Sequence, residues 1–189
     1  MSATNAPFGL RPAFHPSGLD RAQALADGIA SGYAANILKG QPVKYDSNGN
    51  IVVAAAGDTF SGAFAGVEWT DTTGRRRVSN YWPTGTAYVT GSCVAYFYSD
   101  PQIVYEIQAA GSLAQTSIGD QADLSNTTAG STTTGLSQCT LSTSLAGSGT
   151  AQMTIRDLAP YPDNAWGDAY TIVRVTISES QFQATVNAF

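Results

Sequence analysis

The chain is poor in the two residue types that build most metal and redox sites. Its 189 residues include one histidine and two cysteines. This excludes a zinc site with two histidines and the HExxH pattern of metalloproteases. Two cysteines are also too few for a four-cysteine metal site or a disulfide-rich secreted fold. We expect no metal and no cofactor, and we expect Cys93 and Cys139 to stay as buried thiols.

Charge is equally scarce. Only 12% of the residues are Asp, Glu, Lys or Arg, about half the usual share of roughly 25%. Nine basic against fourteen acidic residues give a net charge of −5, so the chain lacks the basic surface that double-stranded nucleic acid requires. No apolar run approaches the roughly 18 to 20 residues that span a bilayer, and no signal peptide is visible. We therefore expect one globular unit, made in a cytoplasm, that binds neither nucleic acid nor membrane.

Recognisable catalytic patterns are missing as well. His15, the only histidine, lies in a proline-rich segment where few neighbours would hold its ring in one tautomer. Asp120 and Asp123 are spaced for a solvent-exposed turn rather than for acid–base catalysis. Residues 147–150 lack the lysine and the strand-to-helix context of a phosphate-binding loop. We therefore expect the protein not to be an enzyme.

What the sequence does contain is a series of short strand patterns. An Asn-Gly pair at 48–49 predicts a hairpin with a type I′ turn between strands at 41–46 and 51–54. Runs rich in aromatic and β-branched residues follow, separated by Gly, Ser and Thr. They predict strands at 62–70, 78–82, 86–90, 92–98, 102–108, 121–124, 136–142, 151–157 and 170–178. The sequence thus predicts an all-β fold, a small antiparallel barrel or sandwich over residues 41–180.

The first forty residues have a different composition. Three prolines within residues 7–16 alternate with Phe8, Leu10 and Phe14, which argues against a regular helix or a central strand. Apolar side chains on such a segment need a surface to cover. We expect residues 1–40 to form an extended N-terminal arm that lies across a neighbouring subunit.

Three other segments give smaller predictions. Apolar spacing over residues 20–30 favours a short helix. Residues 159–167 form a loop of prolines and aromatic residues that includes Trp166, and its composition suits an exposed anchor. Residues 181–189 continue past the last predicted strand, so we expect a C-terminal tail that ends on Phe189.

The one basic cluster is Arg75, Arg76 and Arg77. Arginine forks match phosphate geometry, but Glu68 and Asp71 lie just before the cluster and the whole chain is acidic. A hairpin turn that pairs with carboxylates of a partner, or that is merely solvated, fits these residues better than a phosphate site. We treat the cluster as a secondary contact surface.

Two parts of the sequence resemble a known family. They are Asn5-Ala6-Pro7-Phe8-Gly9-Leu10-Arg11-Pro12 and the stretch from Gly40-Gln41-Pro42-Val43 to Gly62-Ala63-Phe64-Ala65-Gly66-Val67. Together they are similar to head decoration (cement) proteins of tailed bacteriophages, over about the first 70 residues. The resemblance implies a β-domain on the outer face of the capsid, usually a trimer at local threefold positions or a dimer on twofolds. It implies neither an enzyme nor a cofactor.

The resemblance and the composition lead to one expected function. The protein would bind the outer surface of a phage head and stabilise it by clamping neighbouring major capsid subunits, with modest contacts that add through effective concentration. The expected partners are the major capsid protein and further copies of the chain, with a trimer favoured over a dimer. The expected contact residues are Phe8, Leu10, Arg11, Phe14, Arg75, Arg76, Arg77, Trp166 and Phe189.

Two alternatives remain open. Trp69, Trp82 and Trp166, with the nine tyrosines, could provide sugar-stacking platforms in a glycan-binding or host-adhesion module. The same aromatic residues would also suit core and subunit packing. A further alternative is another structural component of the head or tail.

Overall fold

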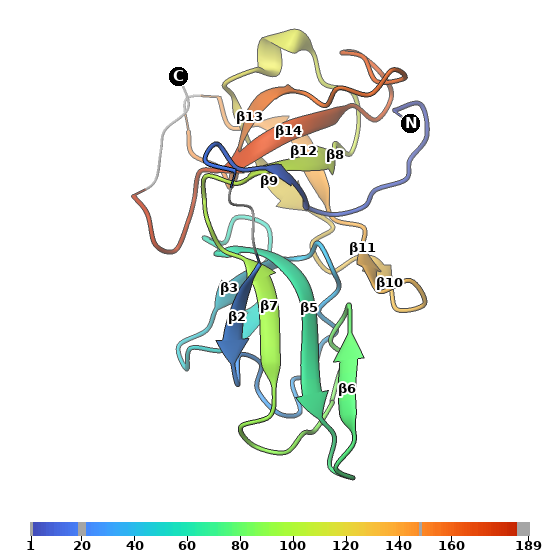
Figure 1. Cartoon of the computed structure of the whole chain (residues 1–189). Helices are drawn as coiled ribbons and strands as arrows, with labels where there is room; N and C mark the ends of the chain where they lie inside the picture. The colour runs from blue at the N-terminus through green and yellow to red at the C-terminus, as the bar shows by residue number, and fades with distance from the viewer. Residues whose placement is uncertain (1, 19–21, 148, 185–189) are drawn as a thin grey trace.

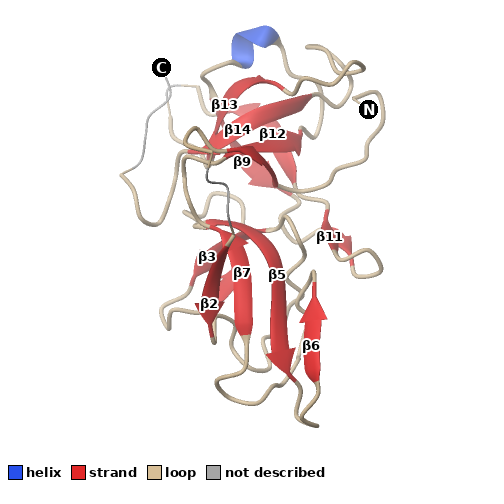
Figure 2. Ribbon diagram, viewed as in Figure 1, coloured by secondary structure: helices blue, strands red, loops and turns tan. Residues whose placement is uncertain are grey.

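A computed structural model describes residues 2–18, 22–147 and 149–184. Within these three ranges the only helical element is one 3-10 turn, η1 (Gln115–Ser117). The strands form two groups stacked end to end (Figure 2), which we call the upper lobe and the lower lobe. Strands pair antiparallel in both groups. The predicted all-β antiparallel fold is confirmed.

The upper lobe is a six-stranded sheet in the order β1-β8-β14-β13-β9-β12. Its strands are β1 (Arg11–Phe14), β8 (Val104–Gln108), β9 (Gln121–Ser125), β12 (Thr140–Leu145), β13 (Met153–Leu158) and β14 (Ile172–Ile177). Ala109, just after β8, forms an isolated bridge with Leu141 of β12, and the Ala110 N–H donates to the Leu141 carbonyl at 2.8 Å. The bridge places β12, the last strand in this order, next to the end of β8, so the sheet curls on itself like a small barrel (Figure 1).

The period-two alternation of the strands separates the inside of this sheet from its outside. Tyr105 and Ile107 of β8 pack in the upper core together with Val173 and Val175 of β14. Glu106, between the two core residues of β8, therefore points to the outer face. The outer face of the upper sheet carries the polar and charged side chains.

The lower lobe has the strand order β2-β7-β5-β3-β4, and β6 pairs with β5 outside this path. Its strands are β2 (Gln23–Ala26), β3 (Pro42–Tyr45), β4 (Ile51–Val53), β5 (Gly62–Thr70), β6 (Arg76–Ser79) and β7 (Val94–Tyr98). A small hairpin, β10 (Gly130–Ser131) and β11 (Leu136–Ser137), lies beside this lobe in Figure 1.

The β3–β4 hairpin forms where the Asn-Gly pair predicts it, but its turn differs from the prediction. Of that pair only Gly49 has a positive φ, of 80°. The Asp46 carboxylate accepts the N–H groups of Asn48 and Asn50 at 2.8 and 2.9 Å. This side-chain cap holds a longer loop in place of the two-residue type I′ turn.

Two strand predictions in the lower lobe are also corrected. Residues 86–90 form no strand, and Tyr88 makes only an isolated bridge to Asp71. The strand predicted at 78–82 begins earlier, at Arg76, because the Asp71 side chain closes the preceding turn. Two of the three clustered arginines therefore lie within β6.

The first forty residues are not a separate arm. β1 pairs with β8, and β2 pairs with β7 where the apolar spacing of residues 20–30 predicts a helix. Leu10, Ile29 and Ile37 are buried in the two cores. β1 tolerates Pro12 because it is an edge strand, and pairing with β7 outweighs a weak local helix preference.

The described part of the predicted tail is also tied to the domain. The Gln181 amide accepts the N–H of Tyr45 at 2.8 Å and donates to its carbonyl at 3.0 Å. Phe182 packs edge-to-face on the Tyr45 ring at 5.6 Å, although it stays 70% exposed. Phe189, expected to be a contact residue, lies outside the described residues.

Buried glutamine amides join the two lobes. Gln152, in the upper lobe, donates from Nε2 to the carbonyls of Ala55 and Asp58 in the lower lobe at 2.9 and 2.7 Å. Its Oε1 accepts the Leu124 N–H at 2.9 Å, within the upper lobe. A single side chain therefore satisfies backbone groups on both sides of the junction.

Two further contacts cross the same junction. Gln41 of the lower lobe accepts the Leu38 N–H and donates to the Thr127 carbonyl, each at 2.6 Å. Phe60, fully buried, joins the upper core from the end of the lower lobe. Burial and paired amides together hold the lobes in one fixed relation.

We expect Gln152→Ala to lower the free energy of unfolding by about 2 to 3 kcal/mol, because it leaves backbone groups at the junction without partners. Gln183→Ala is the control, since that side chain is exposed, and it should change stability by less than about 0.5 kcal/mol. Urea unfolding measures both values. Equal stability of the two variants would contradict the role given to Gln152.

Candidate functional site

Four charged residues of alternating sign cross the outer face of the upper sheet. Asp157 of β13 lies directly across from Arg174 of β14. Arg174 lies across from Glu106 of β8, and Glu106 lies across from Arg11 of β1. Arg11 Nη2 lies 2.7 Å from Glu106 Oε2, and Arg174 lies 3.8 Å from Glu106 and 3.5 Å from Asp157. We call these four residues the charge ladder. Opposite charges directly across neighbouring strands stabilise the sheet.

Phenylalanine rings cover the two arginines of the ladder. The Arg11 guanidinium carbon lies 4.5 Å from the centre of the Phe8 ring. The Arg174 guanidinium carbon lies 5.4 Å from the centre of the Phe14 ring. These cation–π contacts fix four long side chains on the surface before any partner binds.

Tyr161, from the loop before β14, completes the cluster. Its ring lies 5.7 Å from the Arg11 guanidinium, and its hydroxyl donates to Glu106 Oε2 at 2.5 Å. Arg11 Nη2 also donates to the Tyr161 hydroxyl. Burial, together with the hydrogen bond to Glu106, raises the pKa of Tyr161. The charge ladder with Phe8, Phe14 and Tyr161 is named the aromatic–arginine face.

A β-bulge explains why Arg11 and Phe14 share this face. Residues three apart in a regular strand point to opposite sides. The register of β1 shifts between Pro12 and Phe14, so that Arg11 pairs with Glu106 and Phe14 pairs with Val104. Those two partners are two residues apart and lie on the same side of β8. The bulge therefore turns Phe14 outward beside Arg11.

Two of the expected contact residues face inward instead. Leu10 is 1% exposed and packs in the upper core, so it is not available as an anchor. It precedes Arg11, and adjacent strand residues point to opposite faces. Trp166 is only partly buried but packs against the same core.

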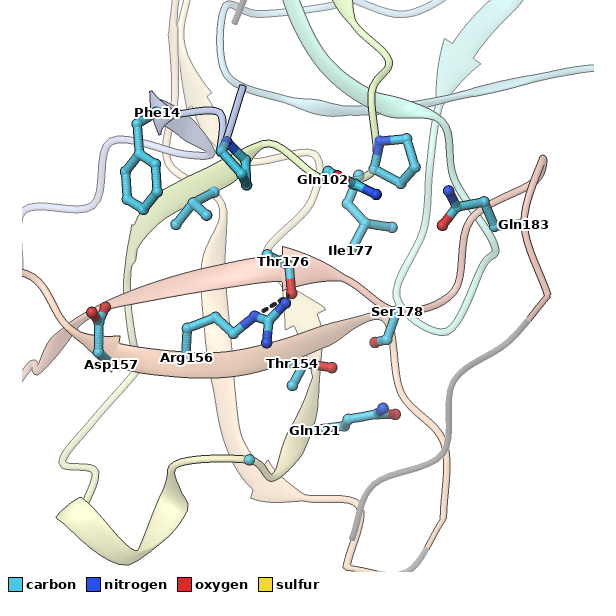
Figure 3. Close-up of a pocket in the computed structure, with 14 residues that line it drawn as sticks. Phe14, Gln102, Gln121, Thr154, Arg156, Asp157, Thr176, Ile177, Ser178 and Gln183 are labelled. Atoms are coloured by element: carbon cyan, nitrogen blue, oxygen red, sulfur yellow. Dashed lines mark hydrogen bonds between the residues drawn. The ribbon is translucent and has the colours of Figure 1, made fainter. Parts of the chain in front are cut away.

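A groove of about 660 Å³ lies next to the charge ladder on the outer face. Phe14 lies at one end and Gln183 at the other (Figure 3). Thr154 and Thr176 form part of its floor. Its remaining lining residues are Pro16, Pro101, Gln102, Val104, Gly119, Gln121, Arg156, Asp157, Ile177 and Ser178.

His15 lies beside the apolar wall of the groove. Its side chain is only 8% exposed, and its Nε2 lies 3.1 Å from the Asp100 carboxylate. Its Nδ1 contacts the N–H of Ser17 at 3.0 Å and the Ser17 hydroxyl at 2.6 Å. The expectation that His15 lacks supporting neighbours is thus wrong. The His15 Nε2 makes no hydrogen bond within the described residues, so its contact with Asp100 places the segments of Pro16 and Pro101 side by side without bonding them.

Arg156 supplies a free cation on the groove floor. Its Nε donates to the Thr176 hydroxyl at 3.1 Å, a contact that is visible in Figure 3. It forms no ion pair with a carboxylate of the described residues, whereas the neighbouring Asp157 contacts Arg174. The described residues of the upper lobe include eight carboxylates and three arginines. Arg156 is the one of these arginines that no carboxylate neutralises.

The three clustered arginines lie at the opposite end of the molecule, at the tip of the lower lobe (Figure 1). Arg76 contacts Glu68 at 2.7 Å, and Arg77 contacts Asp71 at 2.9 Å. Arg75 has no ion pair within the described ranges. The structure therefore does not bring this arginine tip together with the aromatic–arginine face.

Asp71 organises the tip. Its Oδ1 accepts the Thr73 hydroxyl at 2.6 Å and the N–H groups of Thr73 and Arg75, both at 3.0 Å. The bond from Thr73, the Arg75 N–H and the Arg77 guanidinium hold the pKa of the Asp71 carboxyl well below its usual range. The turn that presents the arginines therefore depends on an ionised Asp71.

The tryptophan platform of the glycan alternative is not formed by Trp69 and Trp82. Both are buried, and their rings meet edge-to-face at 5.5 Å inside the lower core.

Within the described residues no group of three or more His, Cys, Asp or Glu could hold a metal ion. No helix in the same residues is long and apolar enough to cross a membrane.

Tyr161, Glu106, Arg174 and Arg156 were not predicted from the sequence as functional residues. Tyr161 stands between two prolines in the aromatic loop, a signal that could have singled it out beside Trp166. Glu106 and Arg174 are isolated charges within apolar strand patterns, and Arg156 stands beside Asp157 in another such pattern. Such charges mark an outer face, but they do not show which strands are neighbours.

Burial raises the pKa of the Cys93 thiol to about 11 and that of Cys139 to about 12. Because thiolates are the reactive form, we expect neither cysteine to react with Ellman's reagent at pH 8 in the folded protein. Both should react after unfolding in guanidinium chloride. Rapid reaction of the native protein would contradict the buried positions.

We expect Asp71→Ala to melt at a lower temperature than the wild type at pH 7. A lowered native pKa stabilises the fold above the unfolded value of about 3.9, and this contribution is lost as the pH falls through the native pKa. The difference in Tm should therefore narrow at pH 3, as measured by circular dichroism. Asp71→Asn, which keeps the side-chain shape, should have a Tm between those of the wild type and Asp71→Ala. A difference that does not change with pH would rule out the ionised carboxylate as the cause.

Comparison with protein-family models, with curated proteins and with solved structures found no match to this chain. The two surfaces of the chain best suited to binding are the aromatic–arginine face with its groove and the arginine tip at the other end.

Proposed function

We propose that this protein decorates the outer surface of a tailed-phage head and stabilises the shell by clamping neighbouring major capsid subunits. The observation that carries the proposal is the aromatic–arginine face. Arginine and aromatic side chains dominate the binding energy of protein interfaces. On this face Phe8, Arg11, Phe14 and Tyr161 are already held in place, so little side-chain entropy is lost on binding.

The separation of the two surfaces supports a clamp. The arginine tip lies at the far end of the lower lobe, and Val78 beside it is 77% exposed. Gln41 and Gln152 hold the lobes in one relation, so the spacing between face and tip is fixed. Two modest contacts joined in this way bind together far more strongly than either does alone.

The proposal includes further copies of the chain as partners, as a trimer at local threefold positions or as a dimer on twofolds. It places the protein on the outside of the virion and assigns it no enzymatic activity. An outer-shell protein does not meet packaged DNA, and the acidic charge of the chain suits that position.

Binding to undecorated capsids tests the proposal. The double variant Phe8→Ser with Phe14→Ser should reduce the affinity at least about tenfold, the loss expected when interface anchors are removed. Arg75→Glu should weaken binding less, because its arginine is at the secondary contact. Leu145→Ser is the matched control, since Leu145 is 36% exposed but lies on β12, at the other end of the upper strand order from β1.

Two measurements decide the outcome. Occupancy on gels of purified particles gives the affinity, and the temperature of capsid disruption gives the stabilisation. Full occupancy by the double variant would overturn the role of the face. Images that place the protein on a tail or connector would assign it to another structural component.

A further inference from the structure

We propose that the groove beside the charge ladder binds an extended peptide segment in which one carboxylate side chain is flanked by apolar residues. The inference rests on the proposed function only in naming the capsid subunit as the source of that segment. The binding chemistry comes from the groove itself. Its volume of about 660 Å³ lies within the range of ligand sites, roughly 300 to 1,000 Å³.

The carboxylate is assigned by Arg156. Its Nε is held by the Thr176 hydroxyl at 3.1 Å, which fixes the plane of the guanidinium on the groove floor. The two Nη groups have no partner among the described residues. A guanidinium fork of this kind binds planar oxyanions through two parallel hydrogen bonds.

The surrounding charge favours a single negative charge over two. The described residues of the upper lobe carry eight carboxylates and three arginines, and Asp157 lies next to Arg156 in the sequence. The attraction to one arginine and the repulsion from the carboxylates both double for a dianion, but the Born cost of removing the anion from water rises with the square of its charge. A carboxylate therefore suits the groove better than a phosphate group does.

The other lining residues suit a peptide chain. The side-chain amides of Gln102 and Gln183 line the groove, and each offers the donor and acceptor that a peptide unit needs. Pro16, Pro101 and Phe14 offer apolar surface along the wall. An extended segment places successive side chains on opposite sides, so its carboxylate can meet the floor while its apolar residues meet the wall.

The test uses the isolated full-length protein and two peptides, acetyl-Ser-Val-Glu-Leu-Ser-amide and the same peptide with Gln in place of Glu. Amide chemical shifts followed by NMR up to about 5 mM peptide detect affinities as weak as Kd near 1 mM. We expect shifts concentrated at Thr154, Arg156 and Thr176. We also expect the Glu peptide to bind at least about fivefold more tightly than the Gln peptide.

A matched pair of variants isolates the cation. Arg156→Gln should remove the difference in affinity between the two peptides. Arg75→Gln, at the other described arginine without an ion pair, should leave that difference unchanged. Both arginines are exposed, so both variants should keep the wild-type fold and spectrum.

The outcomes separate this inference from the proposed function. Absence of shifts at about 5 mM, or equal binding of the two peptides, would overturn the groove assignment. Shifts from trigalacturonate but not from the peptides would assign the groove to an acidic sugar, and tighter binding of inorganic phosphate than of acetate would contradict the preference for a single charge. Capsid binding by the wild type and its loss in the Phe8 and Phe14 variants are measured independently of all these results.

Discussion

A buried carboxylate is the constraint on which the outer face of the upper lobe depends. The Glu106 side chain is only 9% exposed, and an ionised carboxylate in such a place is costly unless charged or hydrogen-bonding groups surround it. Arg11, Tyr161 and Arg174 meet this requirement from three different parts of the chain. Each of them is thereby drawn to one point, and Phe8 and Phe14 follow because they pack on the two arginines.

The same need to satisfy buried polar groups fixes the relation of the lobes. A junction between two small sheets brings together strand ends and turns, whose backbone N–H and carbonyl groups must find partners. Gln152 and Gln41 reach across and supply them. A glutamine is well suited to this position, because one amide can both accept and donate. The result is a molecule whose two exposed surfaces lie at opposite ends of two lobes that are bonded to each other.

Period-two patterns in the sequence predicted most of the strands, and β5 (Gly62–Thr70) has the predicted bounds. The sequence indicated Phe8, Leu10, Arg11 and Phe14 as contact residues of one N-terminal segment, and the structure brings Phe8, Arg11 and Phe14 to the charge ladder. It could not predict the fate of Leu10, because pairing with β8 decides which residues of that segment face the core. The helix expected at residues 20–30 failed for the same reason, since a free sheet edge next to β7 outweighs local preference.

Most details of the candidate site could not be predicted from the sequence. The bulge between Pro12 and Phe14 leaves no mark in composition or spacing, yet it decides which side chains meet. The charge ladder requires β1, β8, β14 and β13 to be neighbours in that order, and their chain order is different. Trp82 shows a different difficulty. The sequence does not tell whether an aromatic residue lies in a core or on a surface, and Trp82 lies in the lower core.

The single-sided pairing of β6 has a consequence for crowding. Among the described strands, β6 pairs only with β5, and its exposed Val78 would invite another strand to add to the sheet. Copies of the chain at high local concentration would be at particular risk of such open-ended stacking. Arg76 and Arg77 oppose it, since two identical edges would bring like charges face to face. The tip of the lower lobe thus carries its own safeguard against aggregation.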